Sequence, residues 1–160
     1  MGFDTDIFDV LDWYILDYLV CSKVKHKSTG YIFGCATVYG TASDEFKQQF
    51  INELHSFMSS SRDPIMIGGD FNLVRCQEDK NNGNIDFHWC DRFNEWIDGN
   101  GLLEIKSIGW RFTWSNNQES PVMSLIDRIF CSIELDQMFP LASAKTLPRR
   151  PSDHVPILGI

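Results

Sequence analysis

The sequence predicts a single α/β domain in which a layered β-sandwich is flanked by helices. Three observations carry this prediction: an amphipathic helix follows a strand-like run, a second helix follows a short buried strand, and several strand candidates come after it. The order β-α-β-α-β-β-β is typical of layered folds with some antiparallel pairing. The chain has 160 residues, 43% apolar and 22% charged, which suits one globular core and is too short for two ordinary domains.

The first twenty residues fit two kinds of element. Apolar side chains recur there at helical spacing, at Phe3, Ile7, Leu11, Tyr14 and Tyr18. The runs 13–16 and 18–20 are equally compatible with strands, and short apolar runs do not separate the two alternatives. The next run, from Tyr31 to Tyr39, is rich in β-branched and aromatic residues and predicts a strand.

Two helices are predicted from apolar periodicity. The first runs from Asp44 to Ser59, with Ser43 as its N-cap and acidic residues in its first turn. Its inward face is expected to hold Phe46, Phe50, Leu54, Phe57 and Met58. The second runs from about Phe87 to Asp98, with Gly99 or Gly101 ending it. Its inward residues are expected to be Trp89, Phe93, Trp96 and Ile97.

The remaining strands are short. A buried strand from Pro64 to Ile67 lies between the two helices and is expected to end in a turn at Gly68-Gly69. Further strand candidates follow the second helix, at 102–105, 111–114, 125–131 and 155–158. Both ends of the chain fall within apolar runs, so we expect one partial domain that spans 1–160 and is incomplete at its N-terminus.

Charge and cysteine content narrow the function classes. A net charge of -8 counts against tight nonspecific binding of nucleic acid, although a site in which a metal bridges carboxylates and phosphate remains open. Five cysteines without C-x-x-C spacing indicate reduced thiols in an intracellular protein, not a disulfide frame or a zinc site. No secretory or targeting signal is visible, and the apolar first stretch contains too many Asp residues to span a membrane.

The run Gly68-Gly69-Asp70-Phe71-Asn72 follows the short buried strand. Ligands of α/β proteins gather at such strand ends. Asp70 and Asn72 are two residues apart, so an extended backbone would aim both side chains to one side, where they could orient a water and contact an anionic transition state. An ordinary turn is the competing interpretation, because Gly, Asp and Asn are common turn residues.

A second candidate site comes from Asp127 and the run Ser152-Asp153-His154. An adjacent Asp-His pair can act in acid/base chemistry or as metal ligands, although a polar turn before a strand is an equally simple interpretation. Asp127 lies in an apolar strand with Arg128 pointing to the opposite face, so it needs another partner. His154 is one candidate, and a structural ion pair with a different Lys or Arg is the alternative.

These pieces together resemble the endonuclease/exonuclease/phosphatase superfamily, and most of all the DNase I-like endonuclease domains of plant LINE-type (non-LTR) retrotransposons. The resemblance rests on five short motifs in order, spread over essentially the whole chain. They are Val38-Tyr39-Gly40, Gly68-Gly69-Asp70-Phe71-Asn72, Phe112-Thr113-Trp114-Ser115-Asn116, Ile126-Asp127-Arg128 and Ser152-Asp153-His154-Val155-Pro156-Ile157.

The resemblance implies a catalytic role for five residues. Asp70 would position or activate the attacking water, and Asn72 would orient it and stabilise the phosphorane-like charge. His154, held by Asp127, would contact the scissile phosphate and share a proton. Tyr39 would donate to the phosphate or to the departing oxygen.

The same resemblance implies a metal and a substrate. Asp153 would lie at or near Mg²⁺ or Mn²⁺, which would act as a Lewis acid on phosphate oxygens. Trp114 would pack beneath the site, and DNA would be the substrate, which places the protein in the nucleus. Arg149 and Arg150 are basic residues close to Asp153 in sequence and could touch the phosphate backbone. No membrane and no obligate protein partner is implied.

One departure from the family pattern leaves the activity open. Family members begin with strands that carry an Asn and then a Glu, the principal metal ligand, and nothing in this sequence fits those positions. A smaller departure is Thr41, where the family usually has Pro. The sequence therefore predicts a DNA-nicking phosphodiesterase, with two alternatives. One is a truncated, catalytically dead remnant of a retroelement endonuclease, and the other is a phosphatase acting on a small phosphorylated molecule.

Overall fold

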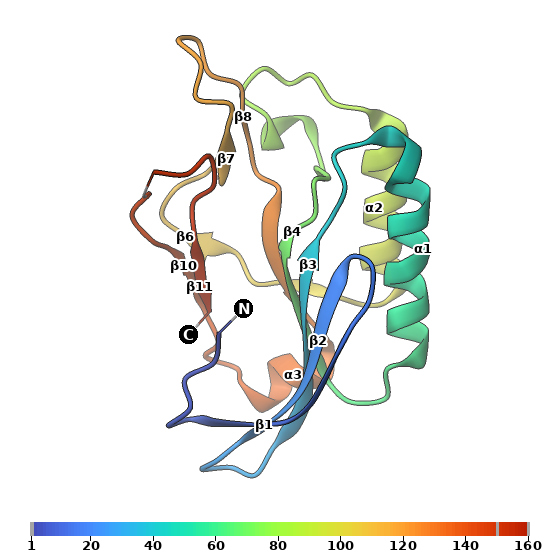
Figure 1. Cartoon of the computed structure of the whole chain (residues 1–160), viewed down its shortest axis with the longest axis vertical. Helices are drawn as coiled ribbons and strands as arrows, with labels where there is room; N and C mark the ends of the chain where they lie inside the picture. The colour runs from blue at the N-terminus through green and yellow to red at the C-terminus, as the bar shows by residue number, and fades with distance from the viewer. Residues whose placement is uncertain (1, 150, 160) are drawn as a thin grey trace.

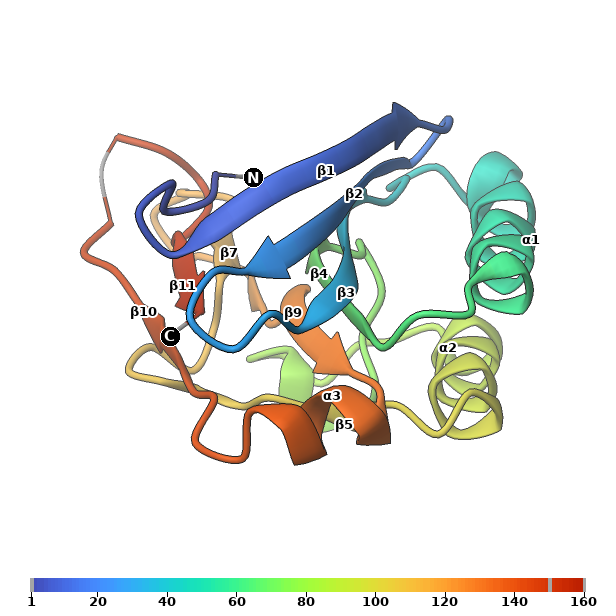
Figure 2. The same cartoon turned by 90° about the horizontal axis from the view of Figure 1, so that it is seen from below.

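The computed structural model describes residues 2–149 and 151–159, which form three layers. A six-stranded sheet lies in the middle, with helices α1 and α2 on one face and strands β6, β10 and β11 on the other (Figures 1 and 2). The large sheet has the strand order β1-β2-β3-β4-β9-β5, the small sheet has the order β11-β10-β6, and β7 pairs with β8 in a two-stranded ribbon. This arrangement is the predicted α/β sandwich.

The elements have the following bounds. The strands are β1 (Phe8–Ile15), β2 (Leu19–His26), β3 (Ile32–Tyr39), β4 (Ile65–Asp70), β5 (Leu103–Glu104), β6 (Ser107–Ile108), β7 (Trp114–Ser115), β8 (Met123–Ser124), β9 (Asp127–Cys131), β10 (Ala144–Thr146) and β11 (Ile157–Gly159). The helices are α1 (Asp44–Ser60), α2 (Phe87–Gly99) and α3 (Ile133–Met138), with a short 3₁₀ turn at Gln77–Asp79. None of the helices in the described residues is long and apolar enough to cross a membrane.

The main core lies between the large sheet and helices α1 and α2. Phe50 and Leu54 of α1, Phe93 and Trp96 of α2 and Phe130 of β9 are fully buried there. Aromatic side chains of this size each remove a large apolar area from water, so this layer is the principal stabilising contact of the fold. Val24, Phe33 and Cys131 belong to a second apolar cluster, on the other face of the same sheet.

Several predictions about elements need correction. The N-terminal residues form strands β1 and β2, so the helical alternative is wrong. Pairing of β1 with β2 and of β2 with β3 supplies the long-range hydrogen bonds that the apolar spacing does not reveal. Phe46, in the first turn of α1, is 45% exposed and does not belong to its inward face, whose buried residues begin at Phe50. Elements β6, β8, β10 and α3 have no counterpart in the prediction, since each has only two to six residues.

The predicted turn at Gly68-Gly69 is also wrong, because β4 continues through both glycines to Asp70. Gly69 has φ +141, and a Cβ at this position would lie 2.2 Å from the Val38 carbonyl oxygen of β3. The glycine is therefore required by the close approach of two parallel strands. One consequence is that Asp70 lies within the sheet, in fixed register with its neighbours.

Candidate active site

Three predicted site residues form a row across the large sheet. Tyr39 of β3 is the register partner of Asp70 of β4, and Asp70 is in turn the partner of Asp127 of β9. Register partners on adjacent strands point to the same face of a sheet. The row therefore places one phenol and two carboxylates together, at the end of the sheet and on the face away from α1 and α2. Tyr39 is 74% exposed, whereas Asp70 is buried.

Asp70 and Asn72 do meet, but through a turn and not along an extended backbone. Asn72 has φ +50, in the left-handed region that Asn tolerates better than most residues. Its backbone N–H donates to Asp70 Oδ1 at 2.8 Å, and its side-chain amide donates to Asp70 Oδ2 at 2.9 Å. The same amide donates to the Gly40 carbonyl at 2.9 Å, so the turn is tied to the end of β3.

Burial sets the proton affinity of Asp70. Loss of solvent raises the pKa of this carboxyl from 3.8 to about 6, and the neighbouring Asp127 carboxylate acts in the same direction. The hydrogen bonds from Asn72 and the nearby His154 oppose the rise without cancelling it. A carboxyl with this pKa is largely ionised at neutral pH and still accepts a proton readily, as a general base must.

His154 joins the two carboxylates, and the expected contact with Asp127 is present. Its Nδ1 lies 3.0 Å from Asp127 Oδ2 and 3.3 Å from Oδ1. Because a carboxylate can only accept, Nδ1 carries the proton, and Nε2 is the ring nitrogen turned toward Asp70, 3.8 Å from its Oδ2. The imidazole is about one-third exposed, whereas the Asp70 side chain is 8% exposed.

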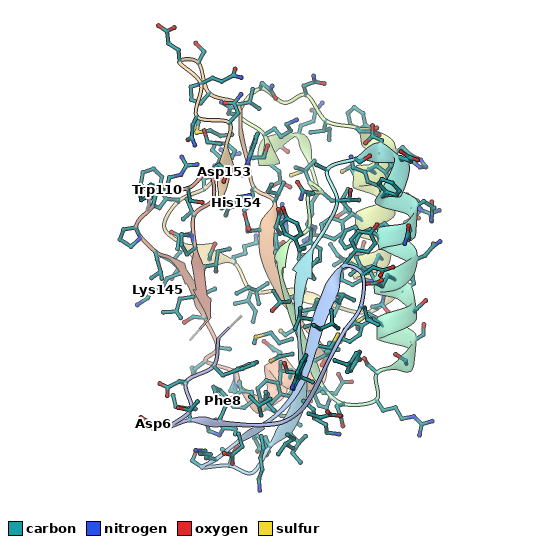
Figure 3. The ribbon with its side chains drawn as sticks, in the orientation of Figure 1. Asp6, Phe8, Trp110, Lys145, Asp153 and His154 are labelled. Atoms are coloured by element: carbon teal, nitrogen blue, oxygen red, sulfur yellow. The ribbon has the colours of Figure 1, made fainter. Side chains whose placement is uncertain are left out.

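Asp153 and His154 are neighbours in the chain segment that precedes β11 (Figure 3), but their side chains have different partners. Asp153 Oδ2 accepts from the indole N–H of Trp114 at 3.1 Å. Its own backbone N–H, and then this indole, hold the pKa of Asp153 below its usual range. Trp114 is half-buried and pairs with His154 through a β-bridge. The exposed Arg149 donates to the Asp153 backbone carbonyl, and Arg150 lies outside the described residues.

The sequence prediction missed one residue next to this cluster. Thr113 is fully buried, and its hydroxyl accepts the backbone N–H of Asp127 at 3.0 Å. The motif Phe112-Thr113-Trp114 was identified from the sequence, but a Thr between two aromatic residues carries no visible sign of a polar contact 14 positions away. Only the folded chain reveals it.

The described residues do not by themselves form a metal centre. Across 2–149 and 151–159, no group of three or more His, Cys, Asp or Glu side chains is arranged to hold a metal ion. Both oxygens of Asp70 accept from Asn72, and both oxygens of Asp127 face His154. Asp153 is turned to Trp114. The predicted Mg²⁺ or Mn²⁺ ligand Asp153 therefore stands apart from the other carboxylates.

Comparisons with known proteins add a family and a fold. Residues 3–154 match the profile of the Endonuclease/Exonuclease/phosphatase family. The structure is similar to the endonuclease domain of TRAS1, a telomere-specific non-LTR retrotransposon, with a TM-score of 0.75 and 17% identity over 98% of this chain and 69% of that one. A search of curated proteins by sequence found no match.

Two further solved structures share the fold. One is an endonuclease/exonuclease/phosphatase family protein from Bacteroides thetaiotaomicron, with a TM-score of 0.60 and 18% identity over 96% of this chain and 65% of that one. The other is D. rerio TDP2 complexed with a single-strand DNA product, with a TM-score of 0.60 and 16% identity over 95% of this chain and 67% of that one. At these identities the likeness concerns the fold, and the chain spans about two thirds of each structure.

Proposed function

Because this chain belongs to the endonuclease/exonuclease/phosphatase family, we propose that it is a phosphodiesterase that nicks DNA by water attack on a phosphodiester. The observation that supports this most directly is the cluster of Asp70, Asp127 and His154. A buried carboxyl with a pKa of about 6 lies beside an imidazole whose proton is fixed by a second carboxylate. Such a pair can move a proton during hydrolysis at neutral pH.

In the proposed reaction, Asp70 is the general base. A water held between Asp70 and the phosphorus loses a proton to the carboxylate as its oxygen attacks. Asn72 keeps the Asp70 carboxylate fixed, because it donates to both carboxylate oxygens. Fixed geometry matters here, since an in-line attack tolerates little displacement of the nucleophile.

His154 and Tyr39 are proposed to act on the phosphate. In its doubly protonated form, His154 keeps Nδ1–H on Asp127 and can donate Nε2–H to a non-bridging oxygen, which would stabilise the charge that develops there. Tyr39 is the exposed member of the row and is proposed to donate its phenol proton to the departing oxygen as the P–O bond breaks. Asp127 acts through His154, by holding its Nδ1–H.

DNA is the proposed substrate. The support is the likeness to the TRAS1 endonuclease domain and to TDP2 bound to a single-strand DNA product, together with the ordered motifs in the sequence. The net charge of -8 argues that electrostatic attraction to the duplex contributes little, so binding without a cation is expected to be weak. For a DNA substrate we propose a nuclear location, which imaging of a tagged chain would check.

Members of this family generally depend on a divalent metal, and Mg²⁺ or Mn²⁺ is proposed as the requirement here. The described residues form no complete ligand set, but Mg²⁺ commonly binds through one or two carboxylates together with substrate phosphate and water. We therefore expect this chain to bind Mg²⁺ or Mn²⁺ only when the phosphate of DNA completes the ligand set. Nicking should stop on addition of EDTA and return with excess Mg²⁺ or Mn²⁺, and nicking that persists in EDTA would contradict the requirement.

The test of the activity is conversion of supercoiled plasmid to the open-circular form. The unchanged chain should nick in Mg²⁺, and Asp70→Ala/His154→Ala should not. Both chains need the same purification and matching circular-dichroism spectra, so that loss of activity is not loss of fold. Equal nicking by the two chains would show that a contaminant acts, and would sink the proposal.

Two other outcomes correspond to other functions. A folded chain that neither binds nor nicks DNA fits a catalytically dead member of the family. Release of inorganic phosphate from small phosphate monoesters without any nicking fits a phosphatase instead. Assays with both substrate classes on one preparation separate these three cases.

A further inference from the structure

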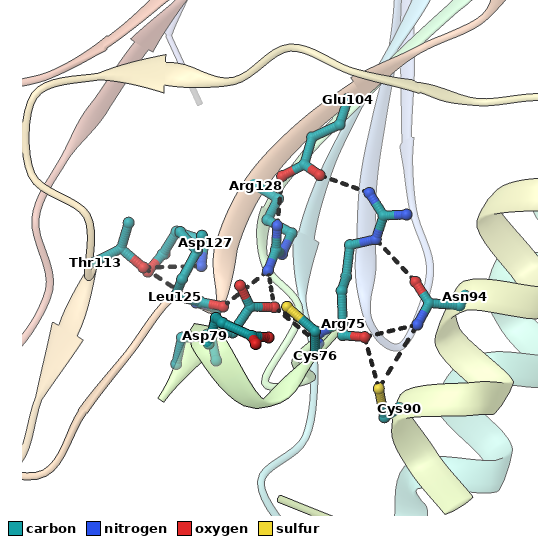
Figure 4. A network of polar contacts seen from close by, with 12 residues as sticks. Arg75, Cys76, Asp79, Cys90, Asn94, Glu104, Thr113, Leu125, Asp127 and Arg128 are labelled. Carbon is teal, nitrogen blue, oxygen red and sulfur yellow. Dashed lines mark hydrogen bonds and ion pairs between the residues drawn. The ribbon is translucent and has the colours of Figure 1, made fainter. Parts of the chain in front are cut away.

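One buried residue contacts both segments that carry the Asp127–His154 pair. Thr113 has 0% exposure, and its hydroxyl oxygen accepts two backbone N–H groups, from Asp127 at 3.0 Å and from Ile126 at 3.2 Å (Figure 4). These two amides lie where the chain enters β9. The Thr113 side chain therefore holds the backbone from which the Asp127 carboxylate projects.

The backbone of Thr113 holds the other segment. Its carbonyl accepts the N–H of Val155, the residue after His154, at 2.7 Å. The next residue, Trp114, forms a β-bridge with His154 itself. Within the residues that the structure describes, Thr113 is thus bonded through its side chain to the Asp127 segment and through its main chain to the His154 segment.

We propose that Thr113 is a positioning residue that sets the contact between Asp127 and His154. It touches neither substrate nor the reacting atoms and acts only through the pair. Its hydroxyl fixes one end of the 3.0 Å Nδ1–Oδ2 contact and its carbonyl fixes the other, so the pair is assembled around a single side chain. The kinetic part of this inference rests on the proposed nuclease activity, and the geometric part does not.

The inference requires the hydroxyl of Thr113 and does not depend on the size of its side chain. Replacing Thr113 with Val keeps the shape and removes the acceptor, which leaves two buried N–H groups without a partner. The Asp127 amide then moves toward another acceptor or toward water, and the carboxylate moves with it. Thr113→Ser restores the acceptor and should restore the contact.

The chain offers a matched control at the far end of the same strand. Ser132 follows β9, and its hydroxyl also accepts two backbone N–H groups, from Ile65 at 3.2 Å and from Leu135 at 3.3 Å. Ser132→Ala removes the same number of hydrogen bonds of the same kind, away from the pair. A merely structural role for Thr113 predicts that the two variants behave alike.

The first measurement is the imidazole Nδ1–H of His154, observed by NMR in the free chain. The unchanged chain, Thr113→Ser and Ser132→Ala should each show a slowly exchanging Nδ1–H, because Asp127 accepts it. Thr113→Val should lose this signal through faster exchange with water. Retention of the signal in Thr113→Val would overturn the inference, as would its loss in Ser132→Ala.

The second measurement is the split between kcat and KM for plasmid nicking. Thr113→Val should lower kcat by between about tenfold and a hundredfold, the scale expected when a catalytic group is displaced by about 1 Å, and leave KM unchanged. Thr113→Ser and Ser132→Ala should keep the original kcat. A fall in kcat of equal size in Ser132→Ala would overturn the positioning role.

A substitute variant and a fallback measurement cover the cases in which Thr113→Val does not fold or the unchanged chain does not nick DNA. If Thr113→Val does not fold, Thr113→Cys takes its place, since a thiol sulfur is a weaker acceptor and should give an intermediate loss of the Nδ1–H signal. An unchanged signal in Thr113→Cys would count against the inference. If the unchanged chain does not nick DNA, the proposed function fails, and the NMR comparison still decides the role of Thr113.

Discussion

Two groups of carboxylates lie on opposite faces of the first residues of β9, and they are neutralised in different ways. On one face, Arg128 donates to both Asp79 and Glu104, and Arg75 binds Glu104 at 2.6 Å (Figure 4). On the other face, Asp70 is held by the neutral amide of Asn72 and by His154, and no Lys or Arg of the described residues forms an ion pair with it.

We interpret this difference as one between a structural network and the proposed reactive cluster. A buried carboxylate paired with a guanidinium joins the segments that supply the two partners, which here are the 3₁₀ turn, β5 and β9. A buried carboxylate without a Lys or Arg partner is raised in energy in its ionised form, and burial accordingly raises the pKa of Asp70 to about 6. Reactive acids and bases are commonly found in the second kind of environment.

The largest expected effect comes from breaking the paired network. Arg128→Met leaves Asp79 and Glu104 buried with too few cations, and should lower the free energy of unfolding by about 3–5 kcal/mol. The side chain of Arg128 is 4% exposed, so water cannot replace it without rearrangement. Urea unfolding monitored by Trp fluorescence would measure the change.

Arg75→Met is the control for the Arg128 variant. Arg75 is 28% exposed and shares Glu104 with Arg128, so its removal should cost clearly less. Equal effects of the two variants, or an Arg128→Met chain within about 1 kcal/mol of the original, would show that the network does not depend on burial.

Removing the charge of Asp70 should change the free energy of unfolding in the opposite direction from removing that of Arg128. The pKa of Asp70 is raised on folding from 3.8 to about 6, so folding favours the protonated form. The stability linked to this proton is fully present below about pH 4 and is lost as the pH rises through 6. Asp70→Asn cannot ionise but loses one of the two acceptor oxygens that Asn72 uses, so its stability relative to the original chain should be higher at pH 7 than at pH 4 by about 1–3 kcal/mol.

Thermal or urea unfolding at the two pH values would check this, with Asp127→Asn as the comparison. Asp127 faces an imidazole at 3.0 Å, so neutralising it removes a favourable contact and should not stabilise. If Asp70→Asn destabilises the chain equally at pH 4 and pH 7, the carboxylate is not strained by burial.

The raised pKa of Asp70 also predicts how nicking depends on pH. The base form of Asp70 grows as the pH passes 6, so kcat/KM should rise about tenfold from pH 5 to pH 7 and then level off. Plasmid nicking at constant ionic strength would give the profile, with DNA retention measured separately at each pH. A flat profile over this range would remove Asp70 from the role of base.

Much of the fold could be predicted from the sequence because long elements carry periodic patterns. Helices α1 and α2 were predicted within one residue at each end, since a 13- to 17-residue amphipathic face is a strong pattern. The short strands β6, β8 and β10 could not be predicted, because two or three residues contain no period and their pairing depends on distant partners. Sequence also could not show that Gly69 serves strand packing and not a turn.

The sequence predicted which residues of the candidate site belong together, but not how they are arranged in space. The isolation of Asp127 in an apolar strand predicted a partner, and His154 is the partner that the structure supplies. Asp70 and Asn72 were expected on the same side of an extended backbone; their direct hydrogen bonds and the left-handed φ of Asn72 were not foreseeable from the residue types alone. Thr113 lay inside an identified motif, yet its two long-range hydrogen bonds depend on register, which no local pattern contains.

The smallest effect is expected for an ion pair on the surface, and it sharpens the comparison. Lys23 and Asp63 are 2.6 Å apart, the same distance as Arg75 and Glu104, but both side chains of the first pair are 44% exposed. Solvent and salt screen such a pair, so Lys23→Met should change the free energy of unfolding by no more than about 0.5 kcal/mol, and less still in high salt.

A double-mutant cycle for Lys23 and Asp63, set beside one for Arg75 and Glu104, would measure the two couplings under one condition. The exposed pair should give a coupling near zero and the half-buried pair a larger one, because Glu104 is less accessible to water and depends more on its protein partners. Equal couplings would mean that distance alone sets the energy of these contacts. In that case the contrast between the Arg128 network and the Asp70 cluster would need an explanation other than burial.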